Sequence, residues 1–217
     1  LLTILSGLDR PTGGTAKVAG IDLLTMSRSQ RVHFQREVVG FVWQQTSRNL
    51  LPYLTARENI ALPLTIAGRR AAATARVAEL IELLDLGDCA DRLPAQLSGG
   101  QQQRAAIAVA VAGSPRLLLA DEPTGELDEA ASVNVLESME KVNAELGVTV
   151  VIVTHDPAVS EHVDRTIQIR DGRTSTEVLR RTEVDEHGAS RRIVEEFAVL
   201  DKVGRMQLPE TFIDQLD

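Results

Sequence analysis

Cysteine, aromatic residues and long apolar runs are scarce in this sequence. Cys89 is the only cysteine, which excludes a disulfide framework and a zinc site built from cysteines. Aromatic residues make up 3% of the chain, too few for a surface that stacks nucleic-acid bases. The longest apolar runs, such as Leu117–Ala120 and Val148–Val153, fall far short of the roughly 18 residues of a membrane-spanning helix. With no visible signal peptide, these absences fit a reducing, cytoplasmic setting.

The charge balance argues against nucleic acid as a partner. The 217 residues carry a formal net charge of −8, which disfavours a protein whose main task is to hold phosphate backbones. Hydrophobic residues make up 43% and charged residues 25%, as in ordinary soluble globular proteins.

Apolar periodicity predicts an α/β protein. We expect helices near Leu1–Leu8, Ser27–Glu37, Thr55–Gly68, Ala72–Leu84 and Ser132–Leu146. Thr55 followed three residues later by Glu58 forms a capping box at the start of the third of these helices. A short hairpin is expected from Thr15–Val18 and Ile21–Leu24, and further strands at Val38–Trp43, Leu117–Ala120 and Val148–Val153. The last two runs are continuously apolar, which is typical of parallel strands covered on both faces.

The segment Leu97–Gln101 reads Leu-Ser-Gly-Gly-Gln. Ser98 followed three residues later by Gln101 forms a capping box at a helix start. Gly99 and Gly100 leave backbone N–H groups bare at the positive end of the helix dipole, which suits an anion. The alternative is a well-capped helix that binds nothing.

Acidic residues and a histidine follow two of the predicted strands. Asp121 and Glu122 end the first, at the edge where open α/β sheets bind ligands. Asp121 suits Mg²⁺, and Glu122 suits the polarisation of an attacking water. His155 follows the second strand and reaches the same edge. The alternatives are a solvated strand end and a histidine with a structural hydrogen bond.

The order of these motifs resembles the nucleotide-binding subunit of an ABC transporter, most closely the lipoprotein-release and macrolide-export branch. Gln44 matches the Q-loop glutamine, and Leu97–Gln101 the signature motif. Asp121 and Glu122 match the Walker B aspartate and the catalytic glutamate. Gly125–Asp128 matches the D-loop, and His155 the switch histidine.

The resemblance implies a P-loop NTPase-like α/β domain over residues 1–180, with a mostly parallel core sheet and an inserted helical subdomain at about 50–115. It implies an ATPase that uses ATP and Mg²⁺ and powers transport through a separate permease. The subunit would lie on the cytoplasmic face of the membrane and pair with a second copy. Catalytic roles then fall to Glu122, His155 and Gln44, metal binding to Asp121 and Gln44, and nucleotide contacts to Ser98, Gly99, Gly100, Gln101 and Asp128.

The sequence departs from the family pattern in two places. No Gly-x-x-x-x-Gly-Lys-Ser/Thr occurs in the 217 residues, and the family places this phosphate loop just before the helix that begins here at Leu1. We therefore expect the sequence to start just past that loop, and these residues alone to be inactive. A non-catalytic subunit that lends its signature motif to a complete partner is the alternative function; a soluble non-transport ABC ATPase is a third. Val109 stands where many relatives have arginine.

The C-terminal residues form a separate region. The charged stretch 181–192 indicates a linker. Residues 193–217 resemble the swapped-hairpin element of transition-state regulators, which implies dimerisation, with an inert tail as the alternative. Acidic residues outnumber basic ones after residue 170, which again argues against DNA binding.

Overall fold

The computed structural model describes residues 1–170, 172–184 and 190–199. The chain divides into two compact units, Leu1–His155 and Asp156–Asp217. Each unit is described by itself. Within the described residues, no helix combines the length and the apolar character needed to cross a lipid bilayer.

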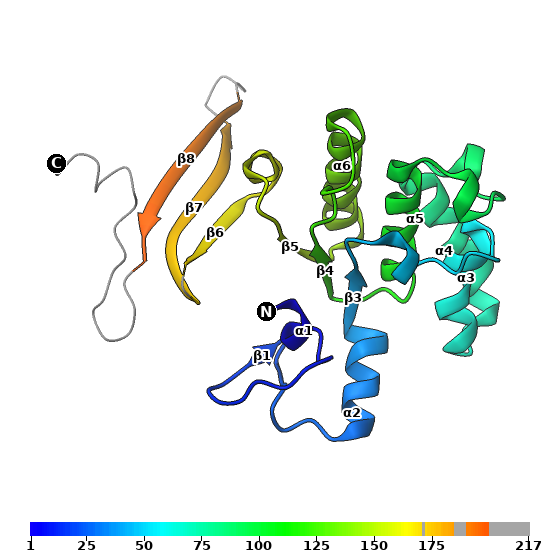
Figure 1. Ribbon diagram of the computed structural model, residues 1–217, viewed down its shortest axis with the longest axis horizontal. Coiled ribbons are helices and arrows are strands. Elements are labelled where there is room, and N and C mark those ends of the chain that lie inside the picture. The colour runs from blue at the N-terminus through cyan, green and yellow to red at the C-terminus, as the bar shows by residue number, and fades with distance from the viewer. Residues whose placement is uncertain (171, 185–189, 200–217) are drawn as a thin grey trace. The chain divides into compact units, whose positions relative to one another are not determined.

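A parallel sheet forms the centre of the first unit (Figure 1). Its strands are β3 (Val39–Val42), β4 (Leu117–Asp121) and β5 (Thr149–Val153), in the order β3-β4-β5. The register pairs Val42 with Ala120 and Asp121 with Val153. The predicted parallel arrangement is confirmed, and the three strands end at one common edge.

Side chains cover both faces of this sheet. Leu118, Leu119 and Ala120 of β4 are all buried. Leu118 and Ala120 belong to an apolar cluster with the helices, whereas Leu119 belongs to a second cluster around Phe34. Burial on both faces explains why this strand reads as a continuous apolar run in the sequence.

The helices of the first cluster are α3 (Ala56–Ile66), α4 (Arg70–Leu83), α5 (Gly99–Val111) and α6 (Glu129–Leu146). The 3₁₀ turn η2 (Thr46–Arg48) lies between β3 and α3, and the turns η3 (Gly87–Cys89) and η4 (Pro94–Gln96) lie between α4 and α5. The predicted capping box of Thr55 and Glu58 opens α3. Helix α5 packs closely against β3: a Cβ placed on Gly40 of β3 would overlap the carbonyl oxygen of Ala110 of α5.

The first helix and the hairpin are shorter than the sequence predicts, whereas the helix expected over Ser27–Glu37 is present. Helix α1 covers only Leu2–Leu5, because Gly7 adopts a φ of +71° that no right-handed helix accommodates. The hairpin is reduced to β1 (Lys17–Val18) and β2 (Ile21–Asp22). Helix α2 (Arg28–His33) continues as the π-helical turn η1 (Phe34–Val38) and leads directly into β3.

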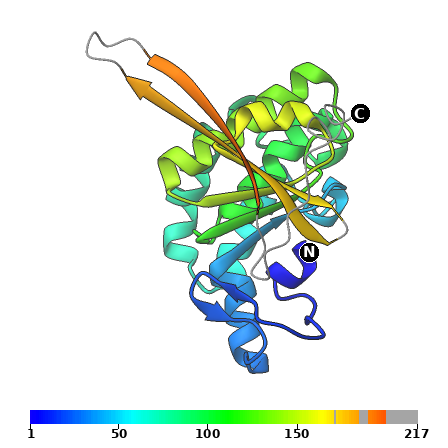
Figure 2. The same ribbon diagram turned by 90° about the vertical axis from the view of Figure 1, so that its left-hand side faces the viewer.

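The second unit is an antiparallel sheet in the order β6-β7-β8. It consists of the 3₁₀ turn η5 (Pro157–His162), β6 (Arg165–Arg170), β7 (Arg173–Val184) and β8 (Ser190–Ala198). Figure 2 shows β7 and β8 as a long twisted pair. Their ladder extends from Thr176 opposite Ala198 to Val184 opposite Ser190.

This ladder changes the expected role of the C-terminal region. Of the predicted linker 181–192, residues 181–184 and 190–192 are strand, because they pair with each other in the ladder. Residues 193–198 pair with β7 rather than with a later strand. Residues 185–189, and 200–217 of the predicted swapped hairpin, lie outside the described residues. The domain boundaries implied by the resemblance stay a prediction.

Candidate functional site

Glu122 directly follows β4 and has an unusual backbone conformation. Its φ is +46°, a left-handed value that is costly for a residue with a side chain. The backbone N–H of Glu122 donates to the carbonyl oxygen of Val153 at 2.9 Å. Its own carbonyl oxygen accepts from the N–H of Gly125 at 3.1 Å. Strain of this kind collects at functional sites, where the surrounding structure holds it.

The carboxylate of Glu122 is bound by the residues that follow β5. Its Oε2 accepts from the Thr154 hydroxyl at 3.0 Å. Its Oε1 accepts from the backbone N–H of His155 at 3.1 Å and contacts His155 Nδ1 at 2.8 Å. Because a carboxylate only accepts hydrogen bonds, Nδ1 carries the proton in this contact. The structure thus brings together two residues that the sequence predicted at one edge.

Exposure differs between the two members of this pair. The side chain of Glu122 is 20% exposed and that of His155 is 87% exposed. The carboxylate is therefore held in a fixed, half-buried position, while the imidazole lies at the surface. A carboxylate fixed in this way can accept a proton from a water molecule beside it.

Gln44 lies at the same edge of the sheet. It is two residues beyond Val42, and Glu122 is two residues beyond the paired Ala120, so the register places both at one level. A Cβ on Gly125 would lie 3.6 Å from Gln44 Nε2 and 3.5 Å from the Glu122 carbonyl oxygen. Gln44 therefore lies beside the loop that follows Glu122.

Asp121 and Gln44 offer the donor set that Mg²⁺ accepts. Asp121 is the half-buried last residue of β4 and lies on the strand next to the one that Gln44 follows. The described residues contain no cluster of three or more histidine, cysteine or acidic side chains fit for a metal. Mg²⁺ at phosphate sites uses only one or two protein oxygens, with phosphate and water completing its octahedron. The two residues fit that requirement.

The predicted capping box at the start of α5 is present. Gln101 N–H donates to Ser98 Oγ at 3.3 Å, and Ser98 N–H donates to Gln101 Oε1 at 3.0 Å. The box occupies these two N–H groups and leaves those of Gly99 and Gly100 as the unpaired first-turn donors. Ser98 and Gly99 are exposed, whereas Gly100 is buried.

The two glycines also have a packing role that the sequence did not reveal. A Cβ on Gly99 would lie 2.9 Å from Leu127 Cδ2, and one on Gly100 would lie 3.3 Å from the Cβ of Ala131. The start of α5 thus lies against the start of α6. Asp128 caps α6, accepting from the Ala131 N–H at 2.8 Å.

A small pocket of about 80 Å³ lies where these segments meet. Its lining comes from the loop after β3, the start of α5 and the loop after β4, namely Gln44, Thr46, Gly99, Gln102, Gln103, Pro123, Glu126 and Leu127. Sequence reasoning missed Gln102 and Gln103. Gln103 lies four and eight residues before Ile107 and Val111, which are fully buried. A glutamine at the spacing of a buried apolar row is the sequence signal that could have identified Gln103.

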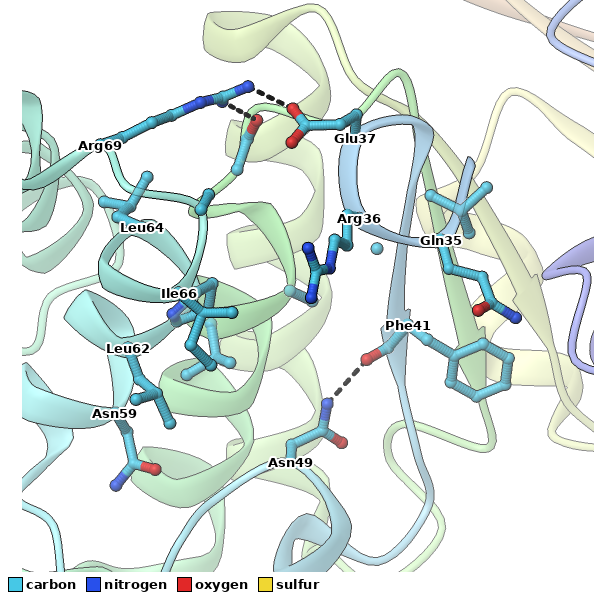
Figure 3. Close-up of a pocket in the computed structure, with 17 residues that line it drawn as sticks. Gln35, Arg36, Glu37, Phe41, Asn49, Asn59, Leu62, Leu64, Ile66 and Arg69 are labelled. Carbon is cyan, nitrogen blue, oxygen red and sulfur yellow. Dashed lines mark hydrogen bonds and ion pairs between the residues drawn. The ribbon is translucent and has the colours of Figure 1, made fainter. Parts of the chain in front are cut away.

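A larger cavity of about 430 Å³ lies between α3, α5 and the outer edge of β3 (Figure 3). Asn49 Nδ2 donates to the Phe41 carbonyl oxygen at 2.7 Å, and its Oδ1 accepts from the Trp43 N–H at 2.9 Å. Arg69 forms an ion pair with Glu37 at one end. Val109 lines the cavity, but none of the predicted site residues does.

Comparisons with known proteins identify the family of this chain. The family model described as "ABC transporter" matches residues 1–125. The lipoprotein-releasing system ATP-binding protein LolD 2 of Caulobacter vibrioides is 46% identical over 166 residues, which are 76% of this chain and 72% of that protein. The macrolide export ATP-binding/permease protein MacB of Syntrophobacter fumaroxidans is 45% identical over 175 residues, and the match spans only 24% of its length.

A solved structure shares the fold. The ATP-binding cassette MJ0796, in a dimeric post-hydrolysis state bound to ADP and Pi, has a TM-score of 0.68 and 38% identity. The match covers 81% of this chain and 77% of that one. The architecture is that of an ABC cassette, whose family consists of ATPases that bind ATP and use Mg²⁺. With more than half of its residues matched by the family model, this chain belongs to the ABC transporter family, among its ATP-binding cassettes.

Proposed function

We propose that this chain forms the ATP-hydrolysing part of a transporter subunit that drives substrate movement through a separate permease. The observation that carries the proposal is the Glu122 carboxylate, held by Thr154 and His155 at the edge of the sheet where Gln44 also lies. ATP would occupy this edge, with its γ-phosphate near Glu122 and His155.

In the proposed mechanism Glu122 accepts the proton of the attacking water. The hydrogen bonds from Thr154 and from the His155 backbone hold the carboxylate in one orientation, so that little reorganisation accompanies the reaction. His155 would donate to the γ-phosphate. Asp121 and Gln44 would hold Mg²⁺, which supplies charge neutralisation on the phosphates.

The nucleotide contacts assigned to Ser98, Gly99, Gly100, Gln101 and Asp128 belong to the same proposal. The exposed start of α5 offers unpaired N–H groups at a helix N-terminus to the phosphates of an ATP molecule held by a second subunit. The dimeric state of the related cassette supports this pairing. The permease partner and a place on the cytoplasmic face of the membrane are proposed from the names of the relatives.

The experiment uses the complete gene product that contains these 217 residues. We expect Mg²⁺-dependent ATP hydrolysis, an ATP-dependent dimer in size-exclusion chromatography, and co-purification with a membrane protein. Absence of both ATP binding and hydrolysis would contradict the proposal. The non-catalytic alternative would instead be supported if the protein did not hydrolyse ATP but its signature motif Leu97–Gln101 stimulated hydrolysis by a complete cassette. The naming of the relatives as ATP-binding proteins does not favour that alternative.

A further inference from the structure

Two successive glutamines at the start of α5 differ in how their side-chain amides are satisfied. Gln102 Oε1 accepts from the Thr46 hydroxyl at 2.8 Å, and its Nε2 donates to the carbonyl oxygens of Pro94 at 3.1 Å and Leu97 at 3.2 Å. Gln103 is only 2% exposed, yet its Nε2 has no hydrogen-bond partner among the described residues. A buried amide donor in a native protein needs a partner.

Gln103 lines the 80 Å³ pocket together with Gln44, Thr46 and Glu126. A buried water requires about 10–15 Å³ of such space and two to four polar neighbours. The pocket meets the volume condition, and its lining includes residues that carry amide, hydroxyl and carboxylate groups. It is far too small for a nucleotide or a drug-sized ligand, which occupies roughly 300 Å³ or more.

We propose that this pocket holds an ordered water organised by Gln103. Water bound to Gln103 Nε2 hydrogen-bonds onward to the amide of Gln44 and to the loop that carries Glu126. Gln103 is then a positioning residue, which fixes the direction of Gln44 although the two side chains form no direct hydrogen bond within the described structure. The inference rests on the proposed function only for the role of Gln44 in metal binding.

The pocket joins three segments that belong to different parts of the fold. Gln102 already ties the loop after β3, through Thr46, to the turn before α5. The water site adds the third segment, the Gly125–Asp128 loop, whose Leu127 packs on Gly99. Movement of any one segment would therefore disturb the water and, through it, Gln44.

The first test is a crystal structure of the complete gene product at about 1.8 Å, without nucleotide. We expect an ordered water within hydrogen-bond distance of Gln103 Nε2 and of Gln44. A dry pocket, or a protein atom bonded to Nε2, would overturn the proposal. This measurement needs no ATP hydrolysis, so its failure is distinguishable from failure of the proposed function.

The second test is Gln103→Leu, which keeps the side-chain volume and removes the amide. Because no protein hydrogen bond at Nε2 is lost, we expect the urea midpoint of unfolding to stay the same or rise. ATP turnover should nevertheless fall about tenfold, as for other residues that orient a metal ligand. In a Gln44→Ala background the same change should have no further effect, because Gln103 acts through Gln44.

Ile107→Val is the matched control, one turn further along the same buried row of α5. It should lower the urea midpoint and leave turnover per folded molecule unchanged. Equal turnover in wild type and Gln103→Leu would overturn the positioning role. Independent, multiplicative effects of Gln103→Leu and Gln44→Ala would do so as well.

Discussion

One oxygen of the Glu122 carboxylate, Oε1, contacts both the imidazole Nδ1 of His155 at 2.8 Å and the backbone N–H of the same residue at 3.1 Å. The ring and the main chain of His155 thus hold one oxygen, while Thr154 holds the other. A neutral amide in place of the carboxylate would keep one acceptor oxygen and would lose the other. The contacts of Glu122 with Thr154 and His155 therefore depend on the charge of the carboxylate as well as on its shape.

Replacement of the carboxylate by an amide should abolish turnover without loss of nucleotide binding. For Glu122→Gln we expect ATP hydrolysis to fall by about 10²–10⁴-fold, the range for removal of a general base. The ATP-bound dimer should then persist in size-exclusion chromatography. Glu137→Gln, at an exposed position on α6, is the control and should retain wild-type turnover. Hydrolysis by Glu122→Gln within twofold of wild type would contradict the assigned role.

The left-handed backbone of Glu122 predicts an inverted order of stability for two further variants. Both Glu122→Gly and Glu122→Ala remove the carboxylate, but only glycine adopts a φ of +46° without steric cost. We expect the free energy of unfolding of the glycine variant to exceed that of the alanine variant by about 1 kcal/mol. At most positions glycine instead destabilises a protein relative to alanine. Urea unfolding monitored by circular dichroism measures the difference. A more stable alanine variant would show that the backbone relaxes here.

Two substitutions of Ser98 should separate helix capping from nucleotide contact. Ser98→Ala removes the acceptor for Gln101 N–H and should lower the free energy of unfolding by about 1 kcal/mol. Ser98→Asp keeps a good cap but places negative charge where phosphate is proposed to bind. It should fold stably and fail to form the ATP-dependent dimer. Dimer formation by Ser98→Asp would speak against phosphate at this helix start.

The close approach of α5 to β3 predicts a large effect at Gly40. Gly40→Ala forces a Cβ into the carbonyl oxygen of Ala110, and a backbone atom moves less readily than the end of a side chain. We expect a loss of about 3 kcal/mol in the free energy of unfolding, at the upper end for overpacking. Gly87→Ala is the control, since nothing lies within 4 Å of a Cβ there, and it should stay within about 0.5 kcal/mol of wild type.

Cys89 provides a pH-dependent test. Burial raises the pKa of its thiol, outweighing the opposite effect of Arg104, so the group stays protonated at neutral pH. Because the pKa of the thiol is higher in the folded than in the unfolded protein, the contribution of this group to the free energy of unfolding is fully present below the ordinary thiol pKa. This contribution is lost as the pH rises through the pKa of the folded state. We expect the urea midpoint to fall at alkaline pH, and to fall less in Cys89→Ala.

Thiol labelling offers an independent check on the same residue. In the native protein Cys89 should react slowly with a disulfide reagent and rapidly in urea, because the thiol is 2% exposed. Fast labelling at neutral pH without urea would contradict the burial of this side chain.

Local chemistry made much of the fold predictable from the sequence. The boxes Thr55–Glu58 and Ser98–Gln101 were predicted from a three-residue spacing and are both present. The apolar runs at 117–120 and 148–153 indicated parallel strands, and β4 and β5 confirm them. These features depend on neighbouring residues along the chain, which is why they could be inferred.

Features that depend on distant residues were not predictable. Glu122, which has the positive φ, donates a backbone hydrogen bond to Val153, and the tight fit of Gly100 depends on Ala131. The helix expected over Leu1–Leu8 ends early because Gly7 turns left-handed close to Phe34. In each case the partner lies in another element, and periodicity contains no information about it.

Asn49 has a consequence for how the molecule behaves among its own copies. Its side-chain amide bonds the outer edge of β3 at Phe41 and Trp43, using one acceptor and one donor as the backbone of a neighbouring strand would. An incoming strand from another molecule would have to break both bonds before it could pair there. A single side chain thus protects this end of β3 from the edge-to-edge association that leads to aggregation.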